Sequence, residues 1–308
     1  MFFSRIIQQK FKPRELQVSK EYLETFFSDP VKNLQTYRES VNPIYSYEND
    51  YEMKRIFIQG KPGYPTVYFI HGLGATFNFY FEGILLLASL GYTVFAHSRR
   101  GEVSAEDNLD NLSVELMVSD MVKQLHKYKI KKFHIIASSF GGILGLKIAS
   151  VLKKNVLSVS TIGSFLKLPW GSAHEIVYKF LKEVNPVRLP VKNLGPFMPP
   201  IQFIKQRSPR LMDFILEEYG TLPVKGIIAY FGVVRKMNYL DRPPHLESPH
   251  LFLHGRFDDM VPISCYNDLQ LRYPECSSTL LENTGHGPFL SLPVDYYNEN
   301  LKFIAKHA

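Results

Sequence analysis

Three residue types that can together activate a hydroxyl group occur far apart in this sequence. Ser139 lies in the string A-S-S-F-G-G, Asp258 in G-R-F-D-D-M-V-P, and His286 in N-T-G-H-G. A serine becomes a nucleophile when a histidine removes its proton, and a carboxylate orients that histidine and stabilises its charged form. These residue types predict nucleophilic catalysis with Ser139, His286 and Asp258 as its candidate residues.

The candidate nucleophile lies where a predicted strand, F-H-I-I-A-S, meets a helix rich in small residues. A serine on a sharp strand-to-helix turn needs small neighbours two positions before and two after it, because larger side chains collide there. Ala137 and Gly141 meet this requirement for Ser139, whereas Ser138 has Phe140 at its second following position. Ser139 is therefore favoured over Ser138. The amides and dipole of the following helix point toward the reacting centre.

The candidate acid and base each follow a later predicted strand. Residues 250–254 (HLFLH) precede Asp258, and residues 278–282 precede His286. Ligands of parallel sheets bind at the carboxyl ends of the strands, so we expect these side chains to meet at that edge. Asp259 is the neighbouring alternative to Asp258.

Strand-like and helix-like segments alternate from about residue 52. Ser113 is a plausible N-cap for the helix that follows it. The predicted strands are 65–71, 92–97, 133–138, 156–162, 250–254 and 278–282, and the predicted helices are 77–90, 114–128, 140–152 and 294–306. Such alternation predicts an α/β fold with a parallel sheet covered on both faces.

The alternation stops between residues 163 and 247. That stretch holds three helix-like runs, 175–184, 210–219 and 226–237, separated by prolines. It predicts a largely helical insertion in the sheet domain. The predicted organisation is an N-terminal extension (1–50), a core (51–162 and 248–308) and an inserted helical cap (163–247).

Four motifs in this order resemble the α/β-hydrolase superfamily, in its branch with a helical cap. They are H-G-L-G at 71–74, the turn around Ser139, G-x-x-D-x-x-x-P at 255–262, and G-H at 285–286. The resemblance implies the α/β-hydrolase fold, a mostly parallel central sheet with helices on both faces. It also implies that Ser139 is the nucleophile, His286 the general base and Asp258 its orienting carboxylate.

The sequence departs from the family pattern at two places. Ala137 replaces the usual glycine before the nucleophile, and it is an accepted small substitute. Ser98 stands where the family usually has an acid two residues before Arg100, and Val103 replaces a second glycine. These changes put the geometry of the loop after residue 97 in question.

The resemblance also implies an oxyanion hole, the pair of amides that binds the carbonyl oxygen as it gains charge. The two donors would be the backbone amides of Leu73 and Phe140. Gly72 and Gly74 would let their loop approach the substrate closely, although they could equally serve only to turn the chain. His71 is expected to shape this loop rather than act as a base.

The expected reaction is ester hydrolysis through an acyl-enzyme, with a small-molecule ester as substrate. Aromatic residues of the predicted cap are candidates for binding an apolar, medium or long acyl group; they are Phe165, Trp170, Phe197 and Phe203. Packing of the cap on the core would explain the same residues. An acyltransferase, a peptidase or C–C bond hydrolase on the same three residues, and a catalytically silent ligand-binding protein stay open.

Composition bears on partners and cofactors. The chain carries 36 Lys plus Arg against 29 Asp plus Glu, a net charge of +7, but these residues are scattered and no nucleic-acid motif accompanies them. We expect no nucleic-acid partner. The Gly72-x-Gly74 pair lacks the third glycine of a dinucleotide site, so no cofactor is expected. Cys265 and Cys276 form neither a disulfide framework nor a metal motif, which indicates a reduced, cytoplasmic protein without a metal.

The first 14 residues combine apolar and basic side chains at helical spacing. Phe2, Phe3, Ile6 and Ile7 alternate with basic residues. One interpretation is a short amphipathic helix in peripheral contact with a membrane. The other is a terminal helix that docks on the protein itself or frays.

Overall fold

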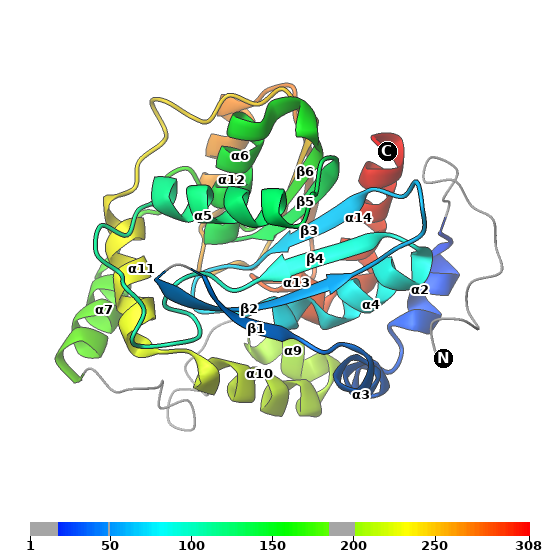
Figure 1. Cartoon of the computed structure of the whole chain (residues 1–308), viewed down its shortest axis with the longest axis horizontal. Helices are drawn as coiled ribbons and strands as arrows, with labels where there is room; N and C mark the ends of the chain where they lie inside the picture. The colour runs from blue at the N-terminus through cyan, green and yellow to red at the C-terminus, as the bar shows by residue number, and fades with distance from the viewer. Residues whose placement is uncertain (1–17, 49, 185–200) are drawn as a thin grey trace.

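The computed structural model describes residues 18–48, 50–184 and 201–308 (Figure 1). An eight-stranded sheet runs through the molecule in the order β1-β2-β4-β3-β5-β6-β7-β8. Its strands are β1 Ile44–Glu48, β2 Tyr51–Ile58, β3 Thr66–Ile70, β4 Thr93–His97, β5 Phe133–Ser138, β6 Val156–Ile162, β7 His250–Gly255 and β8 Ser277–Leu281. Strand β2 pairs antiparallel with both β1 and β4, and every other pair is parallel. This confirms the predicted α/β-hydrolase fold with a mostly parallel sheet.

Helices cover both faces of the sheet, as Figure 1 shows for α5 and α6 on one side of it. The helices on that face are α5 Val114–Lys127, α6 Phe140–Leu152 and α12 Ile263–Arg272. The helices on the opposite face are α2 Lys20–Phe26, α3 Pro30–Ser40, α4 Phe81–Leu90, α13 Pro288–Ser291 and α14 Pro293–Lys306. Short 3-10 helices span Phe77–Tyr80 and Lys153–Asn155. In β3, Val67 and Phe69 join one core while Tyr68 and Ile70 join the other, because side chains alternate along a strand.

Local signals explain where these helices begin. Ser113 has an extended backbone and its hydroxyl accepts a hydrogen bond from the Leu116 amide at 3.2 Å, so the predicted N-cap is confirmed. Helix α4 ends at Gly91, whose φ of 100° suits glycine.

Residues 18–48 are continuous with the sheet domain. They form α2, α3 and the edge strand β1, which pairs with β2 from Ile44 opposite Arg55 to Glu48 opposite Tyr51. The predicted boundary after residue 50 therefore falls in the turn of a β-hairpin. Neither strand of this hairpin was predicted from the sequence.

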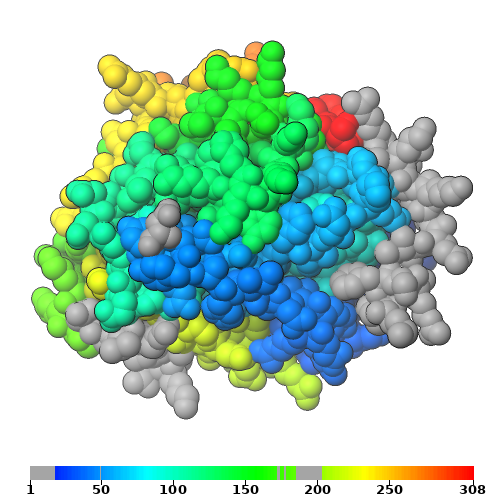
Figure 2. Space-filling model, viewed as in Figure 1, coloured from blue at the N-terminus to red at the C-terminus, as the bar shows by residue number. Residues whose placement is uncertain are grey.

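Every element described between β6 and β7 is a helix. They are α7 Ser172–Val184, α9 Ile201–Arg207, α10 Pro209–Thr221 and α11 Val224–Lys236, here called the inserted helices. Three of them overlap the predicted helical runs, and α9 was not predicted. Their separation as a cap domain with boundaries at 163 and 247 stays a prediction. In Figure 2 the yellow-green surface of α10 adjoins the blue surface of the N-terminal segment, where Arg38 pairs with Glu217 at 2.5 Å.

A partly buried arginine links α9 to the rest of the fold. The Arg207 guanidinium pairs with Glu82 of α4 at 2.6 Å, and it also donates to the carbonyl oxygens of Leu290 and Phe27. Glu82 is 1% exposed. One side chain thus joins α9, α4, α13 and the end of α2.

No helix in the described ranges is long and apolar enough to cross a membrane. Residues 1–14, the candidate membrane-contacting segment, lie outside the described residues. Cys265 and Cys276 are both free thiols.

Candidate active site

Ser139 occupies a strained turn between β5 and α6. Its φ of 51° and ψ of −127° are unfavourable for a residue with a side chain. Its amide donates to the carbonyl oxygen of Ile162 on β6 at 2.8 Å, which fixes the turn. A side chain at Gly141 would overlap the carbonyl oxygen of His71, and one at Gly142 would overlap the hydroxyl of Ser164. The glycines thus allow α6 to begin directly against the neighbouring strands.

His286 and Asp258 form a buried hydrogen-bonded pair. His286 Nδ1 lies 2.7 Å from Asp258 Oδ2, and the side chains are 13% and 0% exposed. The other oxygen, Asp258 Oδ1, accepts from the amides of Met260 at 3.0 Å and Val261 at 2.9 Å. The carboxylate therefore has a fixed orientation. The exposed alternative, Asp259, makes no such contact with the ring.

The two groups change each other's ionisation. Burial opposes the charged carboxylate, but the charge of His286 and its hydrogen bond outweigh burial, so the pKa of Asp258 lies below its ordinary value. Burial likewise opposes the charged imidazole, but Asp258 outweighs it and raises the pKa of His286. Such mutual shifts are expected of a carboxylate that stabilises a protonated histidine.

Ser139 and His286 line one cavity of about 60 Å³. It lies at the carboxyl edge of the parallel strands, where β5, β7 and β8 lead to Ser139, Asp258 and His286 in turn. A Cβ atom on Gly72 would lie 3.0 Å from the Ser139 Cβ, so the 71–74 loop lies directly against the serine. The structure thus brings the predicted residues to one edge of the sheet.

Gly163, the residue after β6, lies against the acid–base pair. It has a φ of 55°, and a Cβ atom there would lie 2.8 Å from Asp258 Oδ2 and 2.9 Å from His286 Nδ1. The sequence analysis did not single it out. A glycine directly after a strand at the catalytic edge is the signal that could have found it.

The two predicted oxyanion donors are both near Ser139. Leu73 lines the same cavity. Phe140 is the first residue of α6, so its amide has no acceptor within the helix. Their role as an oxyanion hole is part of the proposal below.

Arg99 supports the loop that carries Leu73. Its guanidinium donates to the carbonyl oxygens of His71 at 3.0 Å and Gly72 at 2.9 Å, and it pairs with Glu102 at 2.5 Å. Arg99 is 4% exposed. Sequence reasoning missed this residue, and its only signal was an arginine two residues after a buried strand.

The four aromatic residues proposed to bind substrate are not in the described lining of the cavity. Phe165 is 2% exposed in the core beside α6, Trp170 donates to Glu175, and Phe203 stacks on the Phe257 ring at 6.1 Å. Phe197 lies outside the described residues. The described lining is Gly72, Leu73, Ala75, Phe79, Ser138, Ser139, Ile204, Ile215, Tyr219, Met260, His286, Gly287, Phe289 and Leu290. Of the inserted helices, α9 and α10 supply it, with Ile204, Ile215 and Tyr219.

Within the described ranges, no three His, Cys, Asp or Glu side chains gather in an arrangement that would hold a metal ion. The polar side chains in the described lining of the cavity are those of Ser138, Ser139, His286 and Tyr219, and the rest of that lining is apolar.

Comparison with known proteins agrees with this fold. The sequence model of the α/β-hydrolase fold matches residues 65–186. A protein of Cronobacter turicensis assigned as the carbamate hydrolase RutD is 23% identical over 240 residues, which are 75% of this chain and 88% of that protein. A pimeloyl-(acyl-carrier protein) methyl ester esterase of Vibrio vulnificus is 29% identical over 82 residues, 27% of this chain and 32% of that protein.

Solved structures show the same architecture. An esterase from Exiguobacterium antarcticum superposes with a TM-score of 0.70 at 19% identity, covering 83% of this chain and 96% of that one. The order of the strands, the match to the family and this superposition lead to one conclusion. The chain has the α/β-hydrolase fold, and its residues 65–186 match the sequence model of that family.

Proposed function

We propose that the protein is a serine hydrolase that cleaves carboxylic esters through an acyl-enzyme on Ser139. The observation that supports it best is the hydrogen bond of 2.7 Å between His286 and the buried Asp258. This histidine lines the same cavity as a serine in a strained turn. Relatives named as hydrolases and esterases support the same class of reaction.

In the proposed first step, His286 Nε2 accepts the Ser139 proton while Oγ attacks the carbonyl carbon of the ester. Asp258 accepts from Nδ1 and stabilises the imidazolium that forms. The amides of Leu73 and Phe140 donate to the oxyanion, and each such donor contributes about 100- to 1000-fold in rate.

The intermediate then collapses, and His286 returns the proton to the departing alcohol. In the second half, His286 removes a proton from a water that attacks the acyl-enzyme. That attack forms the carboxylic acid, and the proton returns from His286 to Ser139 as the acyl group leaves.

The wall of the cavity limits the acyl group. Its apolar lining suits an uncharged hydrocarbon chain, as expected from the sequence. The enclosed part is small, at about 60 Å³, so it surrounds the carbons of the acyl chain nearest to Ser139, and the cavity opens to solvent beyond them. We therefore propose short to medium acyl groups, with an optimum between butanoate and hexanoate. The medium or long chains expected from the sequence are the alternative that the ester series below tests.

A fluorophosphonate probe tests the nucleophile, because it phosphonylates activated serines. We expect the wild type and Ser138→Ala to be labelled and Ser139→Ala to be unlabelled. Ser138 is a matched control, since it lies in the same wall one residue away. Labelling of Ser139→Ala at the wild-type rate would overturn the assignment.

A series of p-nitrophenyl esters from acetate to dodecanoate tests the substrate. We expect kcat/KM to peak at butanoate or hexanoate and to be at least about ten-fold lower for decanoate and dodecanoate. Because Ser139→Ala removes the nucleophile, it should lower kcat by about 10⁴-fold or more. A rate that rises steadily to dodecanoate would contradict the size limit, and an inactive wild type would contradict the proposed function.

A further inference from the structure

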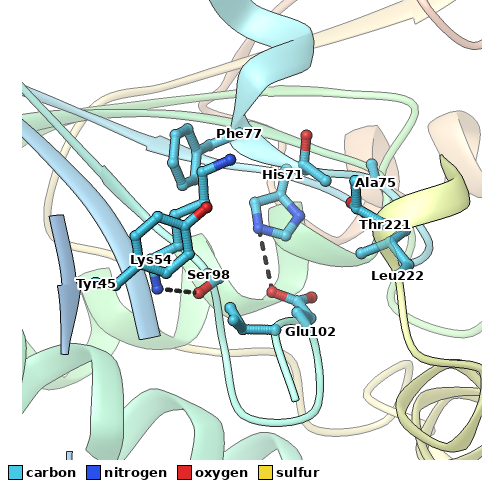
Figure 3. Close-up of a pocket in the computed structure, with 11 residues that line it drawn as sticks. Tyr45, Lys54, His71, Ala75, Phe77, Ser98, Glu102, Thr221 and Leu222 are labelled. Carbon is cyan, nitrogen blue, oxygen red and sulfur yellow. Dashed lines mark hydrogen bonds and ion pairs between the residues drawn. The ribbon is translucent and has the colours of Figure 1, made fainter. Parts of the chain in front are cut away.

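A second and larger cavity lies beside the candidate active site (Figure 3). Its volume is about 220 Å³, and Ala75 lines both cavities, so the two adjoin at the segment that follows the 71–74 loop. The described lining is Tyr45, Lys54, His71, Ala75, Thr76, Phe77, Ser98, Glu102, Val103, Thr221 and Leu222. We call it the Lys54 cavity.

The positive charge in this cavity is the ammonium group of Lys54 on β2. Figure 3 shows the Lys54 side chain between the rings of Tyr45 and Phe77, and Nζ lies 5.9 Å and 5.7 Å from their centroids. In the described part of the chain Lys54 forms no ion pair. Aromatic faces attract a cation but do not neutralise its charge. Lys147 makes a contrast, because it lies 4.9 Å over Tyr239 and also pairs with Glu115 at 3.3 Å.

The carboxylate in the described wall does not serve as the partner of Lys54. Glu102 pairs with Arg99 at 2.5 Å and with His71 Nε2 at 3.3 Å. Burial opposes its charge, yet Arg99 and His71 hold the pKa of Glu102 at about 2. Because Arg99 balances the charge of Glu102, that carboxylate does not neutralise Lys54. The Glu218 carboxylate behind Thr76 accepts from Thr76 and Asn78 and, in the described residues, forms no ion pair with Lys54.

The same wall offers uncharged donors beside the ammonium. The Ser98 hydroxyl accepts from the Lys54 amide at 2.8 Å, and within the described ranges it donates to no residue, so its proton is available. The Tyr45 hydroxyl is a second donor. By contrast, the hydroxyls of Thr76 and Thr221 donate to Glu218.

Ser98 is also the residue at which this sequence departs from the family pattern. A carboxylate at this position would place a negative charge in the same wall as Lys54. Serine keeps the hydrogen bond to the Lys54 amide and leaves the ammonium without a counter-charge. An anion from solution would supply the missing counter-charge.

We propose that the Lys54 cavity binds a small anion through a carboxylate or phosphate group. Lys54 supplies the counter-charge, and the hydroxyls of Ser98 and Tyr45 donate hydrogen bonds to its oxygens. This binding does not depend on the proposed ester hydrolysis. The anion is either a free ligand or the acidic end of a substrate whose ester lies at Ser139, and the two sources are distinguishable.

Binding is tested by titrating inorganic phosphate and adipate into the protein at low ionic strength, followed by calorimetry. We expect both Lys54→Met and Ser98→Asp to weaken binding at least about ten-fold, the second because it supplies an internal carboxylate. Lys147→Met is the matched control, a lysine that also lies over an aromatic ring, and it should bind within about two-fold of the wild type. Thermal unfolding checks that each variant is folded.

The proposal is overturned if the wild type binds neither anion with a Kd below about 10 mM. Equal binding by the wild type and both cavity variants would overturn it as well. The second substitution keeps the test interpretable if Lys54→Met fails to fold. Ser98→Asp can still accept the hydrogen bond from the Lys54 amide, so we expect this variant to fold.

Two esters of equal chain length separate the sources. For an acidic substrate, Lys54→Met lowers kcat/KM at least about ten-fold for mono-p-nitrophenyl adipate and leaves p-nitrophenyl hexanoate within about two-fold. For a free anion, both esters respond alike to Lys54→Met while the titration still shows binding. If neither ester is hydrolysed, the proposed function fails, and the titration alone decides this proposal.

Discussion

A methyl group placed at Gly163 should disable the acid–base pair. In Gly163→Ala the new Cβ would lie 2.8 Å from Asp258 Oδ2 and 2.9 Å from His286 Nδ1, well inside ordinary contact distance. The imidazole and carboxylate would have to move by about half an ångström, and their hydrogen bond of 2.7 Å would be lost or misdirected. An imidazole in the wrong tautomer costs about 10⁴-fold in kcat in serine hydrolases. We expect kcat for a p-nitrophenyl ester to fall by about 10²- to 10⁴-fold.

The backbone strain of this substitution has a matched control. Gly163 has a φ of 55°, and alanine in that region costs about 1–2 kcal/mol. Gly63 has a φ of 85° with no atom within 4 Å of an added Cβ, so Gly63→Ala carries a similar strain without the collision. Both variants should lose a few degrees in Tm, but only Gly163→Ala should lose activity. Activity of folded Gly163→Ala within about three-fold of Gly63→Ala would refute the reasoning.

Two further predictions concern ionisation and stability. Because only the neutral imidazole accepts the serine proton and Asp258 raises the pKa of His286, kcat/KM should fall as the pH drops through a midpoint above 6.5. In Asp258→Asn, burial is opposed only by the charge of Asp259, so a pH–rate profile should place that midpoint lower than in the wild type. Arg207→Met should lower the free energy of unfolding by about 3–5 kcal/mol in urea, because it leaves buried Glu82 unpaired. Arg256 forms an exposed pair with Glu282, so Arg256→Met should leave the urea midpoint of unfolding unchanged. Equal urea midpoints for Arg207→Met and Arg256→Met would contradict this account.

The sequence predicted those parts of the fold whose signals are local. The turn at Ser139 needs small neighbouring residues, and the presence of Ala137 and Gly141 predicted this turn. Ser113 marked the start of α5 in the same way. These features depend on a few consecutive residues, so their physical cause can be read within one segment.

The hairpin of β1 and β2 carried no comparable signal. Strand β1 is an edge strand in which Tyr45 and Tyr47 are 57% and 71% exposed, so it lacks a regular apolar face. Helix α9, only seven residues long between prolines, is too short to show a helical period. Both elements exist because of contacts with distant segments.

In the candidate active site, the residue types predicted the catalytic groups, but they did not predict which residues line the cavity. Ser139, Asp258 and His286 could be proposed because few residue types perform these roles. The wall that faces Ser139 comes instead from Ile204 and Ile215, whose apolar character equally fits core packing. Arg99 was missed for a related reason, since its partners are backbone carbonyl oxygens that no side-chain pattern reveals.

The side chain of Arg207 also restricts how a molecule can enter the cavity. It holds α9, which supplies Ile204 to the wall, to α13, which begins two residues after His286. If helix α9 moved outward, either the ion pair between Arg207 and Glu82 would break or the loop that carries His286 would move with the helix. If the entrance opened at α9, each entering substrate would displace His286, the proposed general base. If substrate enters through another side of the cavity, the catalytic geometry stays intact between turnovers.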